Sequence, residues 1–137
     1  KDGNRFCIVT NQSGVSRGLI KQKELDNIHD YIKNEFMKNS IPLLGIYIAI
    51  DHPDNATIRR KPGVGMFLEA SKDHDIDLKD SLIVGDSKND IQAGKDLGMD
   101  TILVCTGRGS QTILDYPDLE PDAIVSNIEE AADWILK

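Results

Sequence analysis

The chain has 137 residues, of which 39% are apolar and 28% charged, and its formal net charge is −7. This composition is typical of a soluble globular protein and excludes a disordered one, and the length suits a single domain over residues 1–137. An acidic chain is a poor partner for nucleic acid or an anionic membrane surface. The longest apolar run, residues 43–50, is too short to cross a bilayer, and no apolar stretch of signal-peptide length follows the first residues. We therefore expect a cytoplasmic protein that binds neither nucleic acid nor membranes.

Apolar runs and amphipathic segments alternate along the chain. The apolar runs predict strands at residues 6–9, 43–50, 81–84, 101–105 and 123–125. Helices are predicted at residues 21–39, 66–75, 91–97 and 128–136. Strands that are apolar almost throughout are typical of a parallel sheet covered by helices on both faces. The pattern predicts an α/β fold with a doubly wound, mainly parallel, Rossmann-like sheet.

The helix predicted at residues 21–39 has a regular apolar spacing. Its apolar residues recur at intervals of three and four, at Leu25, Ile28, Ile32 and Phe36. This spacing predicts an amphipathic helix whose apolar face packs in the core.

Polar residues follow the predicted strands, at the sheet edge where ligands bind in this architecture. Residues 10–14, Thr-Asn-Gln-Ser-Gly, are suited to holding an oxyanion, although an ordinary polar turn has the same composition. Asp86 and Asp90 are suited to a hard cation such as Mg²⁺. The alternative is a helix N-cap, which Asp86 or Asn89 could provide without a metal. The strand at residues 101–105 is followed by the polar, glycine-rich Thr-Gly-Arg-Gly.

The residues Arg59, Arg60 and Lys61 form the most concentrated positive run of the chain. Such a run is usually a solvated surface. Near a carboxylate–metal site, however, a lysine can neutralise the charge of a phosphate group, and the start of the following helix adds a favourable dipole.

Three segments together resemble the haloacid dehalogenase phosphatases. They are Val-Thr-Asn-Gln-Ser-Gly-Val-Ser-Arg-Gly at residues 9–18, Arg-Lys-Pro at 60–62 with Gly-Met at 65–66, and Val-Gly-Asp at 84–86 with Asp-Ile at 90–91 and Ala-Gly at 93–94. The resemblance covers about residues 6–107, and the Thr-Asn-Gln-Ser-Gly segment is its most specific part. The closest branch contains the heptose bisphosphate and histidinol-phosphate phosphatases.

The resemblance implies a role for each matching residue. Thr10 would bind the transferring phosphoryl group, and Lys61 would stabilise its charge. Asp86 would ligate Mg²⁺ directly, with Asp90 supporting that site. Contacts to the rest of the substrate would come from Asn11, Gln12, Ser13 and Arg60. These roles suit phosphoryl transfer, which depends on positioning and charge neutralisation.

The sequence departs from the family pattern in two places. The family uses an aspartate nucleophile in an Asp-x-Asp motif at the end of an opening strand, and no such strand and motif are found here. We expect the opening strand and first helix to be missing from this sequence. Many members also carry a cysteine-rich zinc loop, but the matching positions here are Ala49, Asp51, Thr57 and Arg59, so we expect no zinc.

These observations predict a Mg²⁺-dependent phosphatase that cleaves a phosphate monoester of a small sugar-like metabolite through an aspartyl-phosphate. A heptose bisphosphate is the first candidate substrate, and histidinol phosphate is the alternative. A non-catalytic protein that binds phosphosugars or a partner is an alternative of another class. A phosphoacceptor receiver domain is disfavoured because its Lys-Pro pair follows its last strand, whereas Lys61 here precedes Asp86.

Overall fold

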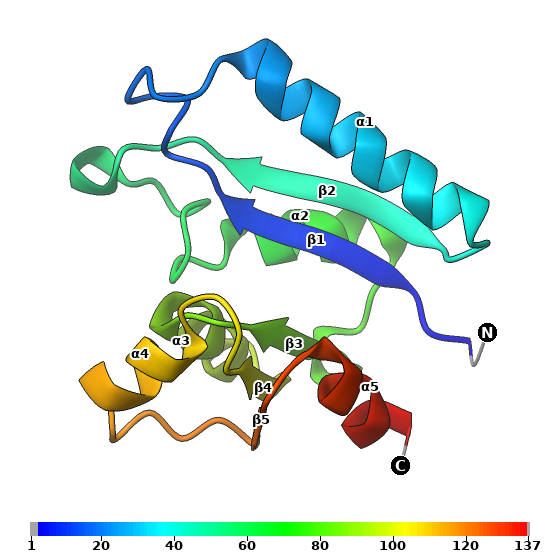
Figure 1. Ribbon diagram of the computed structural model, residues 1–137, viewed down its shortest axis with the longest axis vertical. Helices are drawn as coiled ribbons and strands as arrows, with labels where there is room; N and C mark the ends of the chain where they lie inside the picture. The colour runs from blue at the N-terminus through cyan, green and yellow to red at the C-terminus, as the bar shows by residue number, and fades with distance from the viewer. Residues whose placement is uncertain (1–2, 137) are drawn as a thin grey trace. The chain divides into compact units, whose positions relative to one another are not determined.

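The computed structural model describes residues 3–136. The chain divides into two compact units, one up to Asp75 and the other from Ile76 onward. Both units are built from parallel strands and helices, which confirms the predicted α/β class (Figure 1). None of the helices within residues 3–136 is long and apolar enough to span a membrane.

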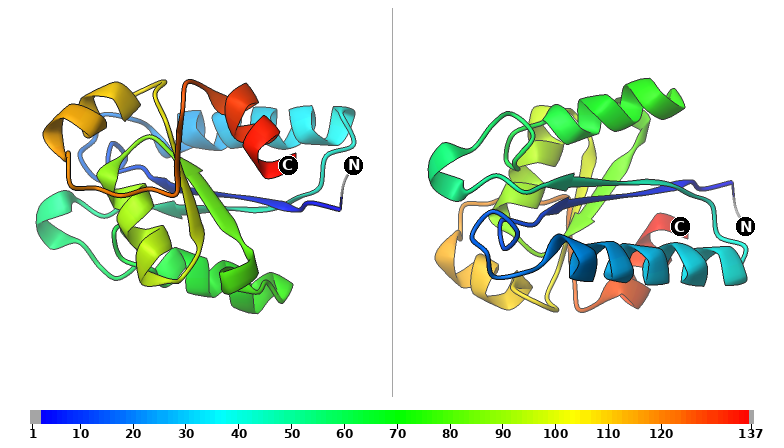
Figure 2. Two further views of the ribbon diagram at one scale, coloured as in Figure 1. Left: turned by 90° about the horizontal axis from the view of Figure 1, so that it is seen from below. Right: turned by 90° about the horizontal axis from the view of Figure 1, so that it is seen from above.

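The first unit is a two-stranded parallel sheet covered by two helices. Its elements are β1 (Phe6–Asn11), α1 (Gln22–Lys38), β2 (Leu43–Ala49), a 3-10 turn (Pro53–Asn55) and α2 (Gly65–His74). Opposite each other in the sheet lie Cys7 and Gly45 at one end and Asn11 and Ala49 at the other. Figure 2 shows α1 and α2 on opposite faces of this sheet. The sheet is therefore buried on both sides, as the apolar strands predict.

The apolar face of α1 differs by one position from the predicted one. Leu25 is buried, and Ile32 and Phe36 are half-buried, but Ile28 is 53% exposed and the half-buried position beside it is His29. The cause is helix geometry, because each residue turns the helix by about 100°. Measured around the helix axis from Leu25, His29 lies about 40° away on one side, within the buried stripe. Ile28 lies about 60° away on the other side, outside that stripe. The prediction that Ile28 is buried is wrong.

The second unit is a three-stranded parallel sheet in the order β3-β4-β5. Its elements are a 3-10 turn (Leu78–Asp80), β3 (Leu82–Gly85), α3 (Lys88–Asp96), β4 (Asp100–Val104), α4 (Gly109–Asp115), β5 (Ala123–Val125) and α5 (Ile128–Leu136). The sequence analysis did not predict α4. This helix has only seven residues and no apolar repeat, so it gives no periodic signal.

The helices α3 and α5 cover opposite faces of the second sheet. Gly94 of α3 lies against Thr101, so close that a Cβ at Gly94 would contact the Thr101 methyl group at 2.7 Å. Ala131 of α5 is fully buried in one cluster with Ile102 and Val104. Because successive residues of a strand point to opposite faces, Thr101 and Ile102 assign the two helices to different sides of β4. The helices cover the faces of the sheet, and polar residues follow the carboxyl ends of β3 and β4.

Candidate active site

The carboxyl end of β1 positions the Thr10 hydroxyl. The strand extends to Asn11, beyond the predicted end at residue 9, so Thr10 is held in the ladder beside Ile48 of β2. The backbone N–H of Gln12 donates to Ala49 O at 2.7 Å and continues this pairing. The Gln12 side chain then turns back, and its Nε2 donates to Thr10 Oγ1 at 3.0 Å. Gln12 therefore orients the hydroxyl that the sequence analysis assigns to the phosphoryl group.

Lys61 is attached to the same end of β1. Its Nζ donates to Val9 O at 2.7 Å, and its side chain and backbone together are only 8% exposed. The backbone of Lys61 also exchanges hydrogen bonds with the side chain of Asn11, at 3.0 Å from the Lys61 N–H and 3.1 Å to the Lys61 carbonyl. An ammonium group thus lies one residue from Thr10 along β1. The first unit brings together a cation and a hydroxyl, the pair that the sequence analysis predicts for binding a phosphate.

The turn after Lys61 requires glycine. The Lys61–Pro62 peptide is cis. A Cβ at Gly63 would overlap the carbonyl oxygen of Ile58, and the Gly63 N–H donates to Arg60 O at 2.7 Å. The chain therefore passes close over its own backbone before α2 begins at Gly65.

Hydrogen bonds hold the loop that leads from β2 to Arg60. The carboxylate of Asp51 accepts from the Thr57 backbone N–H at 2.8 Å and also from the Thr57 hydroxyl. The hydroxyl bond, and next the backbone bond from Thr57, lower the pKa of Asp51 below its ordinary value. Nη1 of Arg60 donates to Asp51 O at 3.3 Å, so the closed loop also carries this guanidinium.

Arg59 ties the same loop to the rest of the first unit. Its Nη2 donates to Ile48 O at 2.6 Å, and its Nη1 pairs with the carboxylate of Glu69. Two of the positions that the resemblance matches to a cysteine-rich zinc loop, Asp51 and Thr57, thus bond directly to each other, while Arg59 anchors the end of the loop. The sequence analysis did not anticipate these contacts.

Ser13 opens a turn, because the Arg17 N–H donates to the Ser13 carbonyl at 3.0 Å. The Leu19 N–H donates to Gly14 O at 2.8 Å, and Ser16 Oγ donates to the carbonyl of Ser13 at 3.0 Å. Ser13 therefore contributes its backbone to the turn. Of the substrate contacts that the resemblance implies, Asn11 and Gln12 bond to neighbouring site residues, and Arg60 bonds to the loop.

In the second unit, Asp86 follows β3 directly and is fixed from three directions. Its Oδ2 accepts from the Arg108 backbone N–H at 3.0 Å, and its carbonyl accepts from Thr112 Oγ1 at 2.8 Å. Its backbone N–H donates to Asp90 Oδ2 at 3.2 Å. The polar, glycine-rich segment after β4 therefore serves to hold this carboxylate.

Asp90 closes a capping box at the start of α3. The helix is capped by Ser87, whose Oγ accepts from the Asp90 N–H at 3.3 Å, while Asp90 Oδ2 accepts from the Ser87 N–H at 3.3 Å. The sequence alternative that Asp86 or Asn89 is the cap is therefore wrong: the residue between them satisfies the first turn. The carboxylate of Asp86 therefore does not cap α3.

The residues around Asp86 fit a magnesium ion. Within residues 3–136 the Arg108 N–H donates to Oδ2 of Asp86 and no donor bonds to Oδ1, so Oδ1 can face a cation. No group of three or more His, Cys, Asp or Glu side chains gathers within the described residues. Mg²⁺ suits such a sparse site, because it takes one or two carboxylates and completes its octahedron with water and phosphate oxygens.

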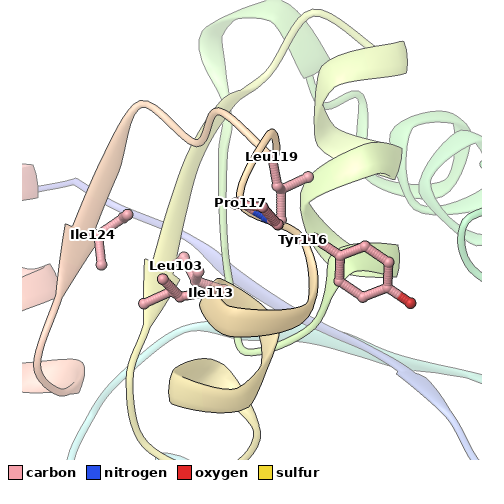
Figure 3. A pocket seen from close by; sticks show the side chains of 6 residues that line it. All are labelled: Leu103, Ile113, Tyr116, Pro117, Leu119 and Ile124. Atoms are coloured by element: carbon pink, nitrogen blue, oxygen red, sulfur yellow. The ribbon is translucent and has the colours of Figure 1, made fainter.

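An apolar pocket in the second unit has a different character. Figure 3 shows its lining side chains, which are Leu103, Ile113, Tyr116, Pro117, Leu119 and Ile124. None of them is a carboxylate or an amine. The nearby ammonium of Lys88 lies 4.7 Å from the centre of the Tyr116 ring, a cation–π contact. The lining residues include no cation that would neutralise a phosphate.

Comparison with known proteins identifies the family. The HAD-hydrolase-like family profile matches residues 58–131, more than half of the chain and parts of both units. This chain belongs to that family, the haloacid dehalogenase-like hydrolases. That both units form one domain stays a prediction.

The relatives with a named activity are heptose bisphosphate phosphatases. D-glycero-alpha-D-manno-heptose-1,7-bisphosphate 7-phosphatase of Burkholderia mallei is 36% identical over 81% of this chain and 62% of its own length. The enzyme of the same name from Photorhabdus laumondii is 33% identical over 91% of this chain and 69% of its own length. A crystal structure of D,D-heptose 1,7-bisphosphate phosphatase from B. bronchiseptica, complexed with magnesium and phosphate, matches with a TM-score of 0.85 and 32% identity over 96% of this chain and 74% of that one. The chain thus spans between about three fifths and three quarters of these relatives.

Proposed function

We propose that the complete protein is a Mg²⁺-dependent phosphatase that removes the 7-phosphate of D-glycero-D-manno-heptose 1,7-bisphosphate. The likeness to heptose bisphosphate 7-phosphatases, at 33% identity over 91% of this chain, is the observation that carries the proposal. The arrangement of Thr10 and Lys61 at the end of β1 supports it, because a hydroxyl and an ammonium suit a phosphate group.

In this proposal the first unit binds the phosphoryl group. Lys61 neutralises negative charge on the phosphate oxygens, and the Thr10 hydroxyl donates to one of them. Arg60, whose guanidinium is planar and carries several donors, contacts the rest of the phosphosugar. Gln12 donates to Thr10 Oγ1, and the Thr10 hydroxyl donates to the Asn11 carbonyl only at a long 3.5 Å, a weak bond that a substrate oxygen would replace.

The second unit supplies the metal ligand. We propose that Asp86 holds Mg²⁺ through Oδ1, with Asp90 supporting the site through the backbone of residues 86 and 87. Bound Mg²⁺ supplies a Lewis acid that stabilises the charge of the transferring phosphoryl group.

The nucleophile in this proposal is the aspartate of the family's Asp-x-Asp motif, a motif that follows no strand within residues 3–136. Attack by this aspartate would give an aspartyl-phosphate, which water then hydrolyses, so that one difficult displacement becomes two easier ones. The coding sequence upstream of residue 1 tests this assignment directly.

The activity is tested with the complete protein and synthetic heptose 1,7-bisphosphate. We expect Mg²⁺-dependent release of one phosphate, with the 1-phosphate retained in the ³¹P spectrum of the product. Replacing Lys61 by Ala should lower kcat by about 10²- to 10³-fold, the usual cost of removing one group that stabilises transition-state charge. Lys61→Arg, which keeps the charge, is the matched control. Faster turnover of histidinol phosphate would overturn the substrate assignment, and tight phosphosugar binding without turnover would overturn the catalytic role.

A further inference from the structure

Asn11 is placed by the resemblance among the residues that contact substrate, but its side chain is occupied within the protein. Its Nδ2 donates to the carbonyl of Lys61 at 3.1 Å, and its Oδ1 accepts from the N–H of Lys61 at 3.0 Å. The carboxamide therefore pairs with both backbone groups of a single residue. Both hydrogen bonds have ordinary lengths.

This pairing determines where Lys61 can be. Residue 61 lies in a loop, and neither its N–H nor its carbonyl belongs to a helix or strand ladder. Asn11 is the last residue of β1 and is anchored opposite Ala49 of β2. Because a carboxamide is planar and its two polar atoms point in fixed directions, two bonds to one residue set both the position and the rotation of that residue's backbone.

The consequence reaches the ammonium group. A lysine side chain has four flexible bonds, and ordering it costs rotamer entropy. With the backbone held at Asn11, the side chain of Lys61 returns to the same strand and donates from Nζ to Val9 O at 2.7 Å. Three hydrogen bonds thus join Lys61 to a stretch of three strand residues, and the residue between Val9 and Asn11 is Thr10.

We propose that Asn11 is a positioning residue for the Lys61 ammonium and does not bind substrate itself. The carboxamide holds the loop so that the ammonium stands beside the Thr10 hydroxyl before substrate arrives. The catalytic part of this inference rests on the proposed phosphatase function. Preorganisation of this kind matters because a displacement of about 1 Å can cost about 10²-fold in rate.

The variants Asn11→Ala and Asn11→Asp of the complete protein test the proposal. The first removes both hydrogen bonds, and the second keeps the acceptor for the Lys61 N–H but loses the donor. The matched control is Asn39→Ala, which removes a bond of the same kind, from Nδ2 to Glu35 O at 2.8 Å, at the end of α1. Thermal unfolding shows how much stability each variant loses.

The first measurement is the rate at which Lys61 is acetylated, followed by mass spectrometry of its peptide. Lys38, whose side chain is 72% exposed, is the internal reference. We expect Asn11→Ala to acetylate several-fold faster at Lys61 than the wild type, Asn11→Asp to lie between them, and Asn39→Ala to match the wild type. Equal acetylation in Asn11→Ala and the wild type would overturn the proposal. If Asn11→Ala does not fold, Asn11→Asp carries the same comparison.

The second measurement is turnover. We expect Asn11→Ala to lower kcat by about 10²-fold with a smaller change in KM, since a displaced ammonium weakens the transition state more than the bound substrate. A rise in KM with kcat unchanged would overturn the proposal in favour of a substrate contact. If the wild-type protein hydrolyses no phosphate ester, the proposed function fails, and the acetylation rates alone decide whether Asn11 fixes Lys61.

Discussion

The backbone N–H of Arg108 donates to Oδ2 of Asp86 at 3.0 Å, so the turn after β4 holds the carboxylate that follows β3. This contact uses one oxygen of the Asp86 carboxylate, Oδ2. It is possible because Gly107 adopts a φ of +59° and has no Cβ. A side chain at residue 107 would overlap Oδ2 of Asp86.

Gly107→Ala should therefore weaken Mg²⁺ binding as well as the fold. We expect a loss of about 1–2 kcal/mol in unfolding free energy from the left-handed backbone and a loss of about 10- to 100-fold in Mg²⁺ affinity from the displaced ligand. Gly98→Ala is the matched control, because Gly98 has a φ of +71° but only the flexible Lys79 side chain near its missing Cβ. Denaturant unfolding and calorimetric Mg²⁺ titration check the pair. Equal Mg²⁺ affinity in the two variants would show that the turn does not position Asp86.

Ser87→Ala should destabilise the second unit through the start of α3. Ser87 Oγ accepts from the Asp90 N–H and donates to Asp90 Oδ2 at 2.9 Å, so both partners lose a bond. The expected cost is about 1 kcal/mol in unfolding free energy, the usual value for an N-cap serine. Asn89 lies near the cap, and within residues 3–136 its side chain makes no hydrogen bond. Asn89→Ala should therefore change the unfolding free energy much less. A larger loss in Asn89→Ala would contradict the assignment of the cap.

Thr57→Val should raise the pKa of Asp51. The Thr57 hydroxyl is the largest cause of the lowered pKa, and valine has the same shape without the donor. Because the folded-state pKa is depressed, the ionised carboxylate stabilises the fold above the unfolded-state pKa, and this contribution is lost as pH falls through the folded-state pKa. Thr57→Val should therefore be less stable than the wild type at neutral pH, with the difference shrinking in acid.

Carboxyl ¹³C titration and unfolding at several pH values check this expectation. In an Asp51→Asn background, Thr57→Val should have the same effect at every pH, because no carboxylate titrates at residue 51. A pKa of Asp51 unchanged by Thr57→Val would contradict the bonding of the loop described here.

The sequence predicts the elements with strong patterns, and it predicts which strand ends are polar. Thr10, Lys61 and Asp86 are candidate site residues because each lies in a short motif after or between apolar runs. What it could not predict is which side chains pair across the chain. Asn11 and Lys61 are 50 residues apart, and no local pattern tells a carboxamide that binds substrate from one that binds a loop.

Local competition explains the other differences. Three of the four residues at 86–89 are of types that can cap a helix, and only the hydrogen bonds of the structure show that Ser87 does so. Ile28 is more apolar than His29 but lies beside the buried stripe of α1. Hydrophobicity alone therefore predicts that the wrong one of these two residues is covered. Hydrogen bonds join Asp51 to Thr57. From the sequence, the resemblance noted these two positions only because they lack cysteine.

The central claim is that Lys61 and Asp86 both serve the hydrolysis of a phosphate ester. The most direct test measures phosphate release from heptose 1,7-bisphosphate by the complete protein with Mg²⁺, beside Lys61→Ala and Asp86→Asn. The account predicts that each substitution lowers kcat by about 10²-fold or more, while the midpoint of thermal unfolding stays near that of the wild type. Near-normal turnover in either variant would contradict it.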